Sequence, residues 1–562
     1  MDAVSLSTAI TTISLAGAYL FSSGRLAPLL ELPRLGFFAA FAALLSVQLL
    51  LYLIWSIILY PKFLSPLRGL PEPSGNSLFM GQFPKIAPHP SGTPHMEWIN
   101  SIPNDGLIRY LGPFNKERLF ITSPKALAEV LVTKNYEFVK PYQFRFSIGR
   151  ILGIGILLAE GDEHKAQRKN LLPAFAFRHI KDLYSIFWDK SREGVEAMTR
   201  EIQRDAANSS AESQNSAVIE VSSWASRITL DIIGVAGLGH DFGAIADPDG
   251  ELSRIYQQLF KPSRQAQFLG LLQILFGARL VDLLPVKRNA DVHSASRKIR
   301  GVCADLIREK KQKLARKELV DVDILSVALE SGGFTDENLV DQLMTFLAAG
   351  HETTASALTW AAYLLARHPD VQARLRAEIR ERLPPISGGG TVSSVDIDRM
   401  PYLNAVCNEV LRYFAPAPMT LRIANCDTSI QGRFVPKGTQ IMIVPWAINK
   451  SKSLWGEDAL EFKPERWLPK SDGDSKSAAA SSGGGATSNY AFMTFLHGPR
   501  SCIGQAFAKA EFACLLASWL GRFELELHNK EEMDESKVEI KGGITARPAK
   551  GMYVKATVLE GW

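Results

Sequence analysis

The chain has 562 residues, 46% of them hydrophobic, and its 63 basic and 58 acidic side chains give a formal net charge of +5. This is the balance of an ordinary globular protein, and the lack of long basic runs with interleaved aromatic residues argues against a nucleic-acid partner. The five cysteines include no C-x-x-C pair, which fits a reduced domain facing the cytosol. The length allows two domains, or one large helical domain with a membrane anchor.

The N-terminal region contains two apolar stretches. No charged residue occurs from Ala3 to Gly24, and none from Leu35 to Pro61. The second stretch exceeds the ~20 apolar residues that cross a bilayer, so residues 35–61 are predicted to form a transmembrane helix. The first stretch, within residues 1–34, is less apolar, and it could be a second span, an interfacial segment or a luminal tail. Asp2 disfavours a cleaved signal peptide.

The anchor is followed by a proline-rich stretch. Pro61 is expected to end the helix, and the prolines and glycines of residues 62–80 predict a stiff hinge. Lys62 and Arg68 favour a cytosolic position for the body of the protein. Residues 81–562 are predicted to form one folded domain.

The domain begins with strands and continues mainly as helices. Residues 108–122 contain two strand-like pieces, and Ser123 followed by Pro124 predicts the start of a helix. Helical patterns dominate from about residue 160. Surface insertions are predicted at the loop-like stretches 205–217, 384–391 and 471–489. The fold class is therefore mainly α, with a smaller β-region.

Two basic side chains share one face of a predicted helix within residues 160–170. His164 and Arg168 are four residues apart, so both could bind the same anion. The alternative interpretation is a solvated basic helix start, which this segment alone would favour.

A long central helix is predicted between Asp336 and His368. Thr335 is its expected N-cap and Pro369 ends it, and at ~1.5 Å per residue it crosses a whole domain. The segment Ala349-Gly-His-Glu-Thr-Thr354 is unusual there, because glycine costs ~1 kcal/mol in a helix interior. We expect Gly350 to open the helix wall to a flat ligand, and Glu352 beside Thr353 to relay protons. A locally polar helix face is the alternative.

A possible charge network involves two distant segments. Glu409 and Arg412 are three residues apart and share a helix face. Such a pair is weak evidence by itself. The segment Phe462-Lys-Pro-Glu-Arg-Trp467 adds a third candidate member, Arg466.

The loop Phe495-Leu-His-Gly-Pro-Arg-Ser-Cys-Ile-Gly504 presents one cysteine at the start of an apolar helical run. Gly498 and Gly504 permit turns and close approach, and the helix N-terminus favours a thiolate at Cys502. A lone cysteine is more often a buried structural residue. Zinc would need further ligands, whereas haem iron accepts a single thiolate as its protein ligand.

Written as Phe-x-x-Gly-x-Arg-x-Cys-x-Gly, residues 495–504 resemble the haem-binding loop of the cytochrome P-450 family at every specified position. Glu352 and Thr353 resemble the acid and alcohol pair of that family. The Glu409, Arg412 and 462–467 elements resemble its buried charge network, which has a structural role. The motifs occur in the order of the family, and the resemblance covers about residue 60 to the end.

The resemblance implies a cytochrome P-450 fold, a large helical domain with a smaller β-region, that binds haem b through the axial thiolate of Cys502. Phe495 would pack beside the thiolate, and Glu352 and Thr353 would assist proton delivery. His164 stands where the family has a tryptophan. The residues implied to contact the haem propionates are His164, Arg168, Arg422 and Arg500.

The resemblance also implies a membrane-anchored monooxygenase that inserts one oxygen atom from O2 into a lipophilic small molecule, such as a terpenoid, polyketide or alkaloid. Only 562 − 502 = 60 residues follow Cys502, and no flavin or nicotinamide fingerprint is present. Electrons would come from NADPH through a separate cytochrome P-450 reductase, with cytochrome b5 as a second donor. The implied location is the endoplasmic reticulum, with the domain facing the cytosol.

Other functions stay open at this point. A fatty-acid or xenobiotic hydroxylase would share every motif. A haem-thiolate isomerase or dehydratase would keep Cys502 but typically lack the acid and alcohol pair, and a haem sensor would need no reductase. The apolar residues 265–284 are expected to form a roof over the substrate. Candidate pocket residues are Phe346, Ala349, Pro418, Met419, Ile544 and Thr545.

Overall fold

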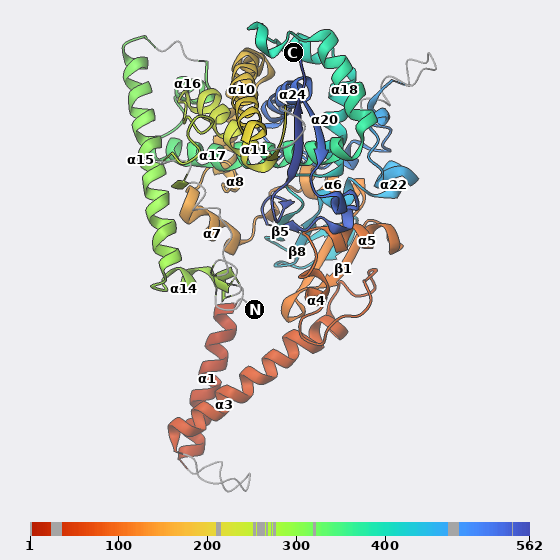
Figure 1. Cartoon of the computed structure of the whole chain (residues 1–562). Coiled ribbons are helices and arrows are strands. Elements are labelled where there is room, and N and C mark those ends of the chain that lie inside the picture. The colour runs from red at the N-terminus through yellow and green to blue at the C-terminus, as the bar shows by residue number, and fades with distance from the viewer. Residues whose placement is uncertain are drawn as a thin grey trace.

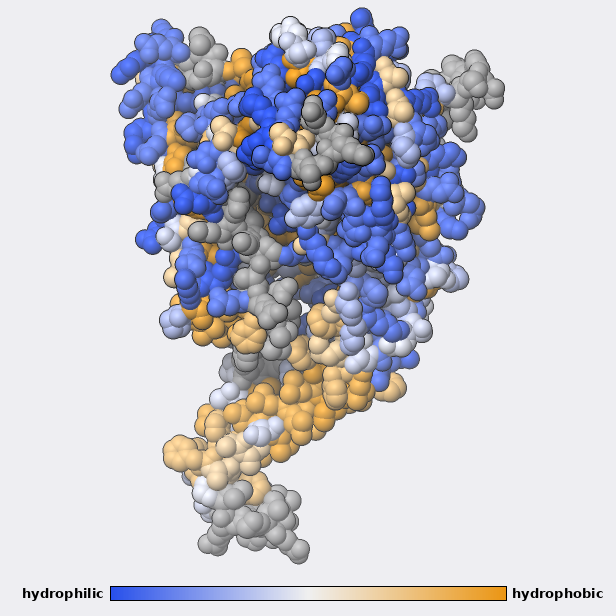
Figure 2. All heavy atoms as spheres, in the orientation of Figure 1, coloured by the Kyte–Doolittle hydropathy of each residue, from blue (hydrophilic) through white to orange (hydrophobic). Residues whose placement is uncertain are grey.

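A helical body stands on an N-terminal stalk of two apolar helices (Figures 1 and 2). The computed structural model describes residues 3–23, 36–208, 215–250, 254–255, 265, 268–270, 272–273, 277–318, 322–469, 483–541 and 543–562. The body is mainly α-helical with small β-sheets at one side, so the predicted fold class is confirmed.

The central helix α17 spans Asp336–Arg367 and crosses the middle of the body (Figure 1). The side chain of its N-cap Thr335 accepts a hydrogen bond from the Asn338 N–H at 3.2 Å, and the helix ends before His368 and Pro369. The predicted boundaries are therefore confirmed to within one residue. Its packing partners are α11 (Val221–Ile232), α15 (Lys287–Ala315), α20 (Pro401–Tyr413) and α24 (Gln505–Arg522).

Further helices surround this centre. The longer ones are α5 (Thr93–Ser101), α7 (Tyr142–Leu152), α8 (Gly161–Leu171), α10 (Tyr184–Asn208), α16 (Ile324–Glu330) and α18 (Pro369–Arg382). The short ones are α4 (Phe83–Ile86), α6 (Pro124–Ala128), α9 (Phe177–Ile180), α14 (Ala278–Asp282), α19 (Ser394–Asp398), α21 (Pro445–Ile448) and α22 (Lys452–Trp455).

The largest described sheet has the strand order β1-β2-β8-β5-β3. β2 and β8 run parallel, and the other neighbours are antiparallel. Its strands are β1 (Leu107–Leu111), β2 (Glu117–Ile121), β3 (Phe138–Val139), β5 (Thr420–Ala424) and β8 (Gln440–Ile443). β1 and β2 are the strands predicted within residues 108–122. This sheet matters for the site because it places β3 beside β5.

Smaller sheets complete the body. A three-stranded sheet has the order β4-β12-β9, and β6-β7 and β10-β11 form two hairpins. Their strands are β4 (Ser216–Glu220), β6 (Thr428–Ile430), β7 (Arg433–Val435), β9 (Phe523–Leu527), β10 (Ile540–Lys541), β11 (Arg547–Pro548) and β12 (Tyr553–Val558).

A helix is present where the transmembrane span was predicted, and it ends three residues later than expected. α3 (Phe37–Ile54) continues as a π-helical segment, η1 (Trp55–Leu64), and residues 37–64 together are long and apolar enough to cross a bilayer. The expectation that Pro61 ends the helix was wrong. Proline has no N–H to donate, and a π-helical turn can accommodate it without ending the helix.

The proline-rich stretch after the anchor is fastened to the sheet. The buried Arg109 of β1 donates to the Pro61 carbonyl at 2.6 Å and pairs with Glu72 and Glu117. Asn115, between β1 and β2, donates to the Ile57 and Leu78 carbonyls at 2.8 and 2.7 Å. The anchor is therefore attached firmly to the body at its C-terminal end.

Several predicted insertions fall only partly within the described residues. The stretch 205–217 is shorter than predicted, since α10 continues to Asn208 and β4 begins at Ser216. Within 384–391 a 3-10 turn spans Ile386–Gly388. Residues 471–482 and, within the predicted roof, residues 266–267, 271 and 274–276 lie outside the described residues.

Candidate functional site

The loop that carries Cys502 is held by its own backbone. The Cys502 N–H donates to the Phe495 carbonyl at 2.9 Å, and the Ser501 N–H donates to the Gly498 carbonyl at 3.0 Å. Gly498 has φ +79°, and a Cβ there would collide with the Leu131 carbonyl oxygen. Only glycine fits this position, so the loop geometry depends on it.

The Cys502 side chain is accessible although protein surrounds it. Desolvation raises the pKa of its thiol, and the Gly504 N–H and the Arg168 guanidinium oppose that rise. Phe495 lies at the other end of the loop and is partly buried. An accessible sulfur beside an N–H donor and a cation suits a thiolate that binds a metal.

Three cations gather at this loop: the buried Arg422 and Arg500, and the largely buried Lys140. Arg500 donates to the carbonyls of Asn135 and Phe138 at 3.0 and 2.8 Å and forms an ion pair with Glu160. The Lys140 ammonium lies 3.5 Å from the Glu160 carboxylate. Arg422 joins them because Val139 of β3 pairs with Ile423 of β5, which brings the adjacent Lys140 and Arg422 together.

This cluster carries more positive than negative charge. Burial and the nearby Arg422 and Arg500 lower the pKa of Lys140 to about 7. Burial and Arg500 likewise lower the pKa of Arg422 to about 10. The buried Nε of Arg500 has no hydrogen-bond partner among the described residues. An anion bound here would offset the repulsion among these cations and would accept a hydrogen bond from the Arg500 Nε. The two propionates of haem fit that requirement.

His164 and Arg168 of α8 reach the same region in different ways. Arg168 donates to the Ser501 carbonyl at 2.7 Å and to its hydroxyl at 3.3 Å, next to Cys502. His164 is buried, with Nδ1 3.1 Å from the Tyr136 hydroxyl. Burial and the charges of Arg500 and Lys140 lower its pKa to about 4. His164 is therefore neutral at physiological pH, and it offers a hydrogen bond rather than a charge.

The unusual segment of α17 presents one accessible face in a helix that is otherwise largely buried. Ala349, Glu352 and Thr353 lie on that face, as their spacing along a helix requires. The Thr353 hydroxyl donates to the Ala349 carbonyl at 2.8 Å. Glu352 pairs with Arg547 of β11 at 3.3 Å. An acid and a hydroxyl therefore lie next to each other on the central helix, and a cation from β11 lies beside the acid.

Gly350 has a packing role that was not expected from the sequence. A Cβ at this position would lie 2.9 Å from the Cδ1 of Ile233, in the segment η6 (Ile233–Leu238). The glycine therefore allows α17 to approach η6.

Glu511 of α24 is a functional candidate that the sequence analysis passed over. It is fully buried, and desolvation raises the pKa of its carboxyl well above the ordinary value, with only partial opposition from the Thr354 hydroxyl. Burial therefore favours the protonated form of this acid. A single acid among Ala510, Phe512 and Ala513 was the available signal.

We expect Glu511→Gln to stabilise the protein increasingly as the pH rises. The raised pKa means that folding keeps Glu511 protonated, so the wild type loses stability as the pH approaches the folded-state pKa, whereas glutamine does not titrate. Below pH ~4, where the carboxyl is protonated in both states, the two proteins should unfold alike. Thermal unfolding across pH tests this, and a pH-independent difference would contradict it.

The buried charge network behaves as predicted from the two segments. Arg412 donates to Glu409 through two bonds of 2.8 and 2.7 Å, and Arg466 donates to the same carboxylate at 3.1 Å. Arg412 also donates to the Asn449 carbonyl at 2.9 Å. The Asn449 side-chain amide in turn accepts a hydrogen bond from the Met493 N–H and donates one to the Thr494 hydroxyl. Both residues lie directly before the Cys502 loop. The network thus braces the loop.

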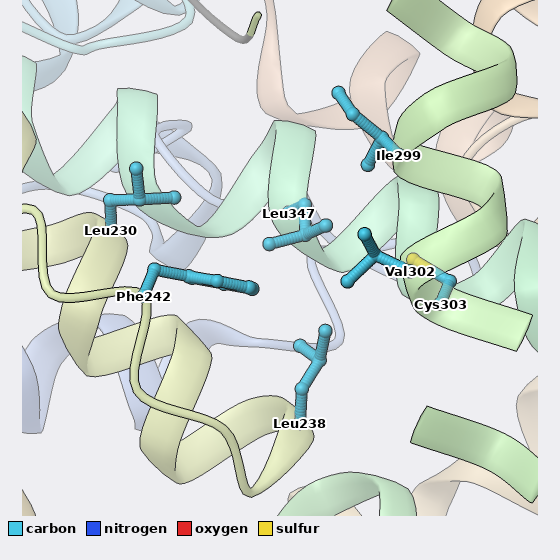
Figure 3. Close-up of a pocket in the computed structure, with 7 residues that line it drawn as sticks. All are labelled: Leu230, Leu238, Phe242, Ile299, Val302, Cys303 and Leu347. Atoms are coloured by element: carbon cyan, nitrogen blue, oxygen red, sulfur yellow. The ribbon is translucent and has the colours of Figure 1, made fainter. Parts of the chain in front are cut away.

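A separate apolar pocket lies between α11, α15 and α17 (Figure 3). Its volume of about 10 Å³ holds little more than one water molecule. It is therefore too small for a substrate. It is lined by Leu230, Leu238, Phe242, Ile299, Val302, Cys303 and Leu347.

The comparison with protein families identifies the class of this protein. The cytochrome P450 family matches residues 71–555, which is most of the chain and includes every motif described above. The chain belongs to the cytochrome P450 family, whose cofactor is a haem with a cysteine thiolate ligand.

Curated relatives agree with this assignment. The cytochrome P450 monooxygenase sphH of Aspergillus fumigatus is 47% identical over 93% of this chain and 94% of the relative. The cytochrome P450 monooxygenase FUM15 of Gibberella moniliformis is 45% identical over 90% of each chain. The cytochrome P450 monooxygenase buaD of Petromyces alliaceus is 40% identical over 99% of each chain. These relatives are all named monooxygenases, which supports an oxygenase over a haem sensor or an isomerase or dehydratase.

Proposed function

We propose that Cys502 is the axial ligand of haem iron and that the buried cations beside it hold the two propionates. The observation that carries the proposal is the surplus of buried positive charge next to an accessible thiol, with the Arg500 Nε left unpartnered among the described residues. Phe495 supports the thiolate loop. The propionate-binding residues are His164, Arg168, Arg422, Arg500 and, beyond those expected from sequence, Lys140.

When bound, the haem supplies the iron at which O2 is reduced. Each turnover places one oxygen atom in the substrate and releases the other as water, which consumes two electrons and two protons. The Thr353 hydroxyl delivers these protons. Glu352, which pairs with Arg547, then returns a proton to the Thr353 hydroxyl. Because both side chains are accessible on one face of α17, water can connect them.

We infer that the substrate is a lipophilic small molecule, and that the reaction is a tailoring hydroxylation or oxidation of a terpenoid, polyketide or alkaloid. Support comes from the high identity with fungal monooxygenases along nearly the whole chain. The electrons come from NADPH through a separate cytochrome P450 reductase, with cytochrome b5 as a second donor. The protein resides in the endoplasmic reticulum membrane with its domain in the cytosol, anchored by residues 37–64.

Microsomes that contain the expressed protein provide the test. We expect a thiolate-type carbon monoxide difference spectrum and NADPH consumption that depends on added reductase. A panel of terpenoids, polyketides and alkaloids, with fatty acids and xenobiotics as the competing class, is then screened for substrate-induced spin shifts. A response confined to the fatty acids or xenobiotics would replace the tailoring assignment with the competing one.

Thr353→Ala is expected to uncouple NADPH consumption from product formation. Alanine keeps the helix propensity and removes the hydroxyl that delivers protons, so the electrons should leave as hydrogen peroxide. Product per NADPH should fall at least about 10-fold, since a positioned acid or base typically contributes ~10²–10⁴-fold to the rate. The measurement is peroxide and product per NADPH, with the neighbouring Thr359→Ala as control, because its hydroxyl is buried on the Ala355 carbonyl. Unchanged coupling would remove Thr353 from the mechanism.

A further inference from the structure

The first helix of the stalk, α1 (Ala3–Ser22), has the dimensions of a membrane span. Its 20 residues carry no charge, and at ~1.5 Å per residue they extend about 30 Å, the thickness of the hydrocarbon core. We propose that α1 crosses the membrane as a second span and forms a helical hairpin with α3. The N-terminus then lies on the same side of the membrane as the catalytic domain.

The two helices pack against each other in antiparallel directions. Ser14 of α1 accepts a hydrogen bond from the Gln48 amide at 3.2 Å, and a Cβ at Gly17 would lie 2.7 Å from the Cδ1 of Leu44. The residue number rises along α1 as it falls along α3, which defines the antiparallel arrangement. Figure 1 shows α1 beginning close to the body and α3 returning to it.

The contact between α1 and α3 has the character of a helix interface within a membrane. Ser14 and Ala18 are fully buried and one turn apart, which is the small-x-x-x-small pattern that lets helix backbones approach closely. Ala40 of α3 is also buried. The polar Ser14 and Gln48 satisfy each other inside this interface, as groups in hydrocarbon must.

The faces that point away from the interface suit lipid. On α1, Ile13 and Tyr19 are about 60% exposed, and on α3 the exposed fractions of Phe38 and Leu51 are 84% and 60%. Figure 2 shows hydrophobic residues covering this stalk, in contrast to the largely hydrophilic face of the body. A soluble protein rarely exposes so large an apolar surface. We therefore infer that the hydrocarbon of the bilayer covers the exposed faces of α1 and α3.

An interfacial position for α1 does not fit its composition. A helix that lies in the membrane surface needs a charged or strongly polar face, and α1 has none. The charges fall instead between the two helices, at Arg25, Glu31 and Arg34. These charges favour a position in water for the segment that joins α1 to α3, on the side of the membrane opposite the catalytic domain.

The side on which the N-terminus lies follows from the attachment of α3. Its C-terminal extension is fixed to the body through Arg109 and Asn115, so this end is on the side of the domain. An antiparallel α1 therefore begins on that same side. A single-span anchor would place the N-terminus on the opposite side.

Glycosylation mapping in microsomes separates these topologies. A flexible Gly/Ser extension with an Asn-Gly-Thr acceptor is placed either before Met1 or between Leu29 and Leu30 of the full chain. The hairpin predicts a glycan on the second protein and none on the first. Glycans on both proteins would show a single span and overturn the proposal, as would no glycan on the second.

Variants of α1 give an independent check. Ile13→Arg with Leu15→Arg puts charges on the lipid-facing side and should expel α1, so the acceptor before Met1 becomes glycosylated. Ser14→Ala is the matched control, since it removes the bond to Gln48 but keeps α1 apolar, and its pattern should match the wild type. An unglycosylated N-terminal acceptor in the arginine variant would contradict the hairpin. The carbon monoxide spectrum of the same membranes reports the proposed haem site separately.

Discussion

Replacing Cys502 with alanine is expected to abolish oxygenation. The substitution removes the thiolate that we assign to haem iron, and no other described cysteine lies in the Phe495–Gly504 loop. The loop should keep its shape, because the hydrogen bond from the backbone N–H of residue 502 to the Phe495 carbonyl and the turn at Gly498 do not involve the cysteine side chain. Product formation should fall to background, and the thiolate-type carbon monoxide difference band should disappear.

The exposed Cys426 provides the control, since it lies outside the loop and Cys426→Ala should retain full activity. Thermal unfolding of the haem-free proteins separates loss of the ligand from loss of the fold, and Cys502→Ala should unfold at nearly the wild-type temperature. Turnover by the Cys502 variant at the wild-type rate would disprove the assignment of the axial ligand.

The sequence alone was sufficient for features that depend on local chemistry. α17 was predicted to within one residue because Thr335 caps its start and Pro369 ends it. The Glu409 and Arg412 pair was predictable from helical spacing. In the same way, the charge-free run after Leu35 identified α3.

Features that depend on distant contacts were not accessible from the sequence. Lys140 joins the cationic cluster because β3 pairs with β5, nearly three hundred residues later, and nothing beside Lys140 in the sequence indicates that pairing. The packing role of Gly350 was missed because its neighbour Ile233 comes from η6. The proline at position 61 was taken as a helix end, because the local rule for proline does not consider a π-helical turn.

Glu409→Gln is expected to cause the largest loss of stability among single substitutions in the charge network. Glutamine keeps the shape of the side chain but leaves the buried guanidinium of Arg412 without a counter-charge and leaves Arg466 with Asp458 as its counter-charge. Breaking a buried ion pair in this way costs ~3–5 kcal/mol. Because Asn449 links Arg412 to the residues before the Cys502 loop, haem loading should fall together with stability.

The matched control for Glu409 is Glu465→Gln, in the same region but on the surface. Glu465 pairs with Arg374 at 3.0 Å, and both side chains are about half exposed, so the loss should stay below ~1 kcal/mol. Denaturant unfolding and the haem content per protein are measured for both variants. If the two variants lost the same stability, the Glu409 cluster would not act as a buried network. If Glu409→Gln lost stability but kept full haem loading, the brace between that network and the Cys502 loop would be refuted.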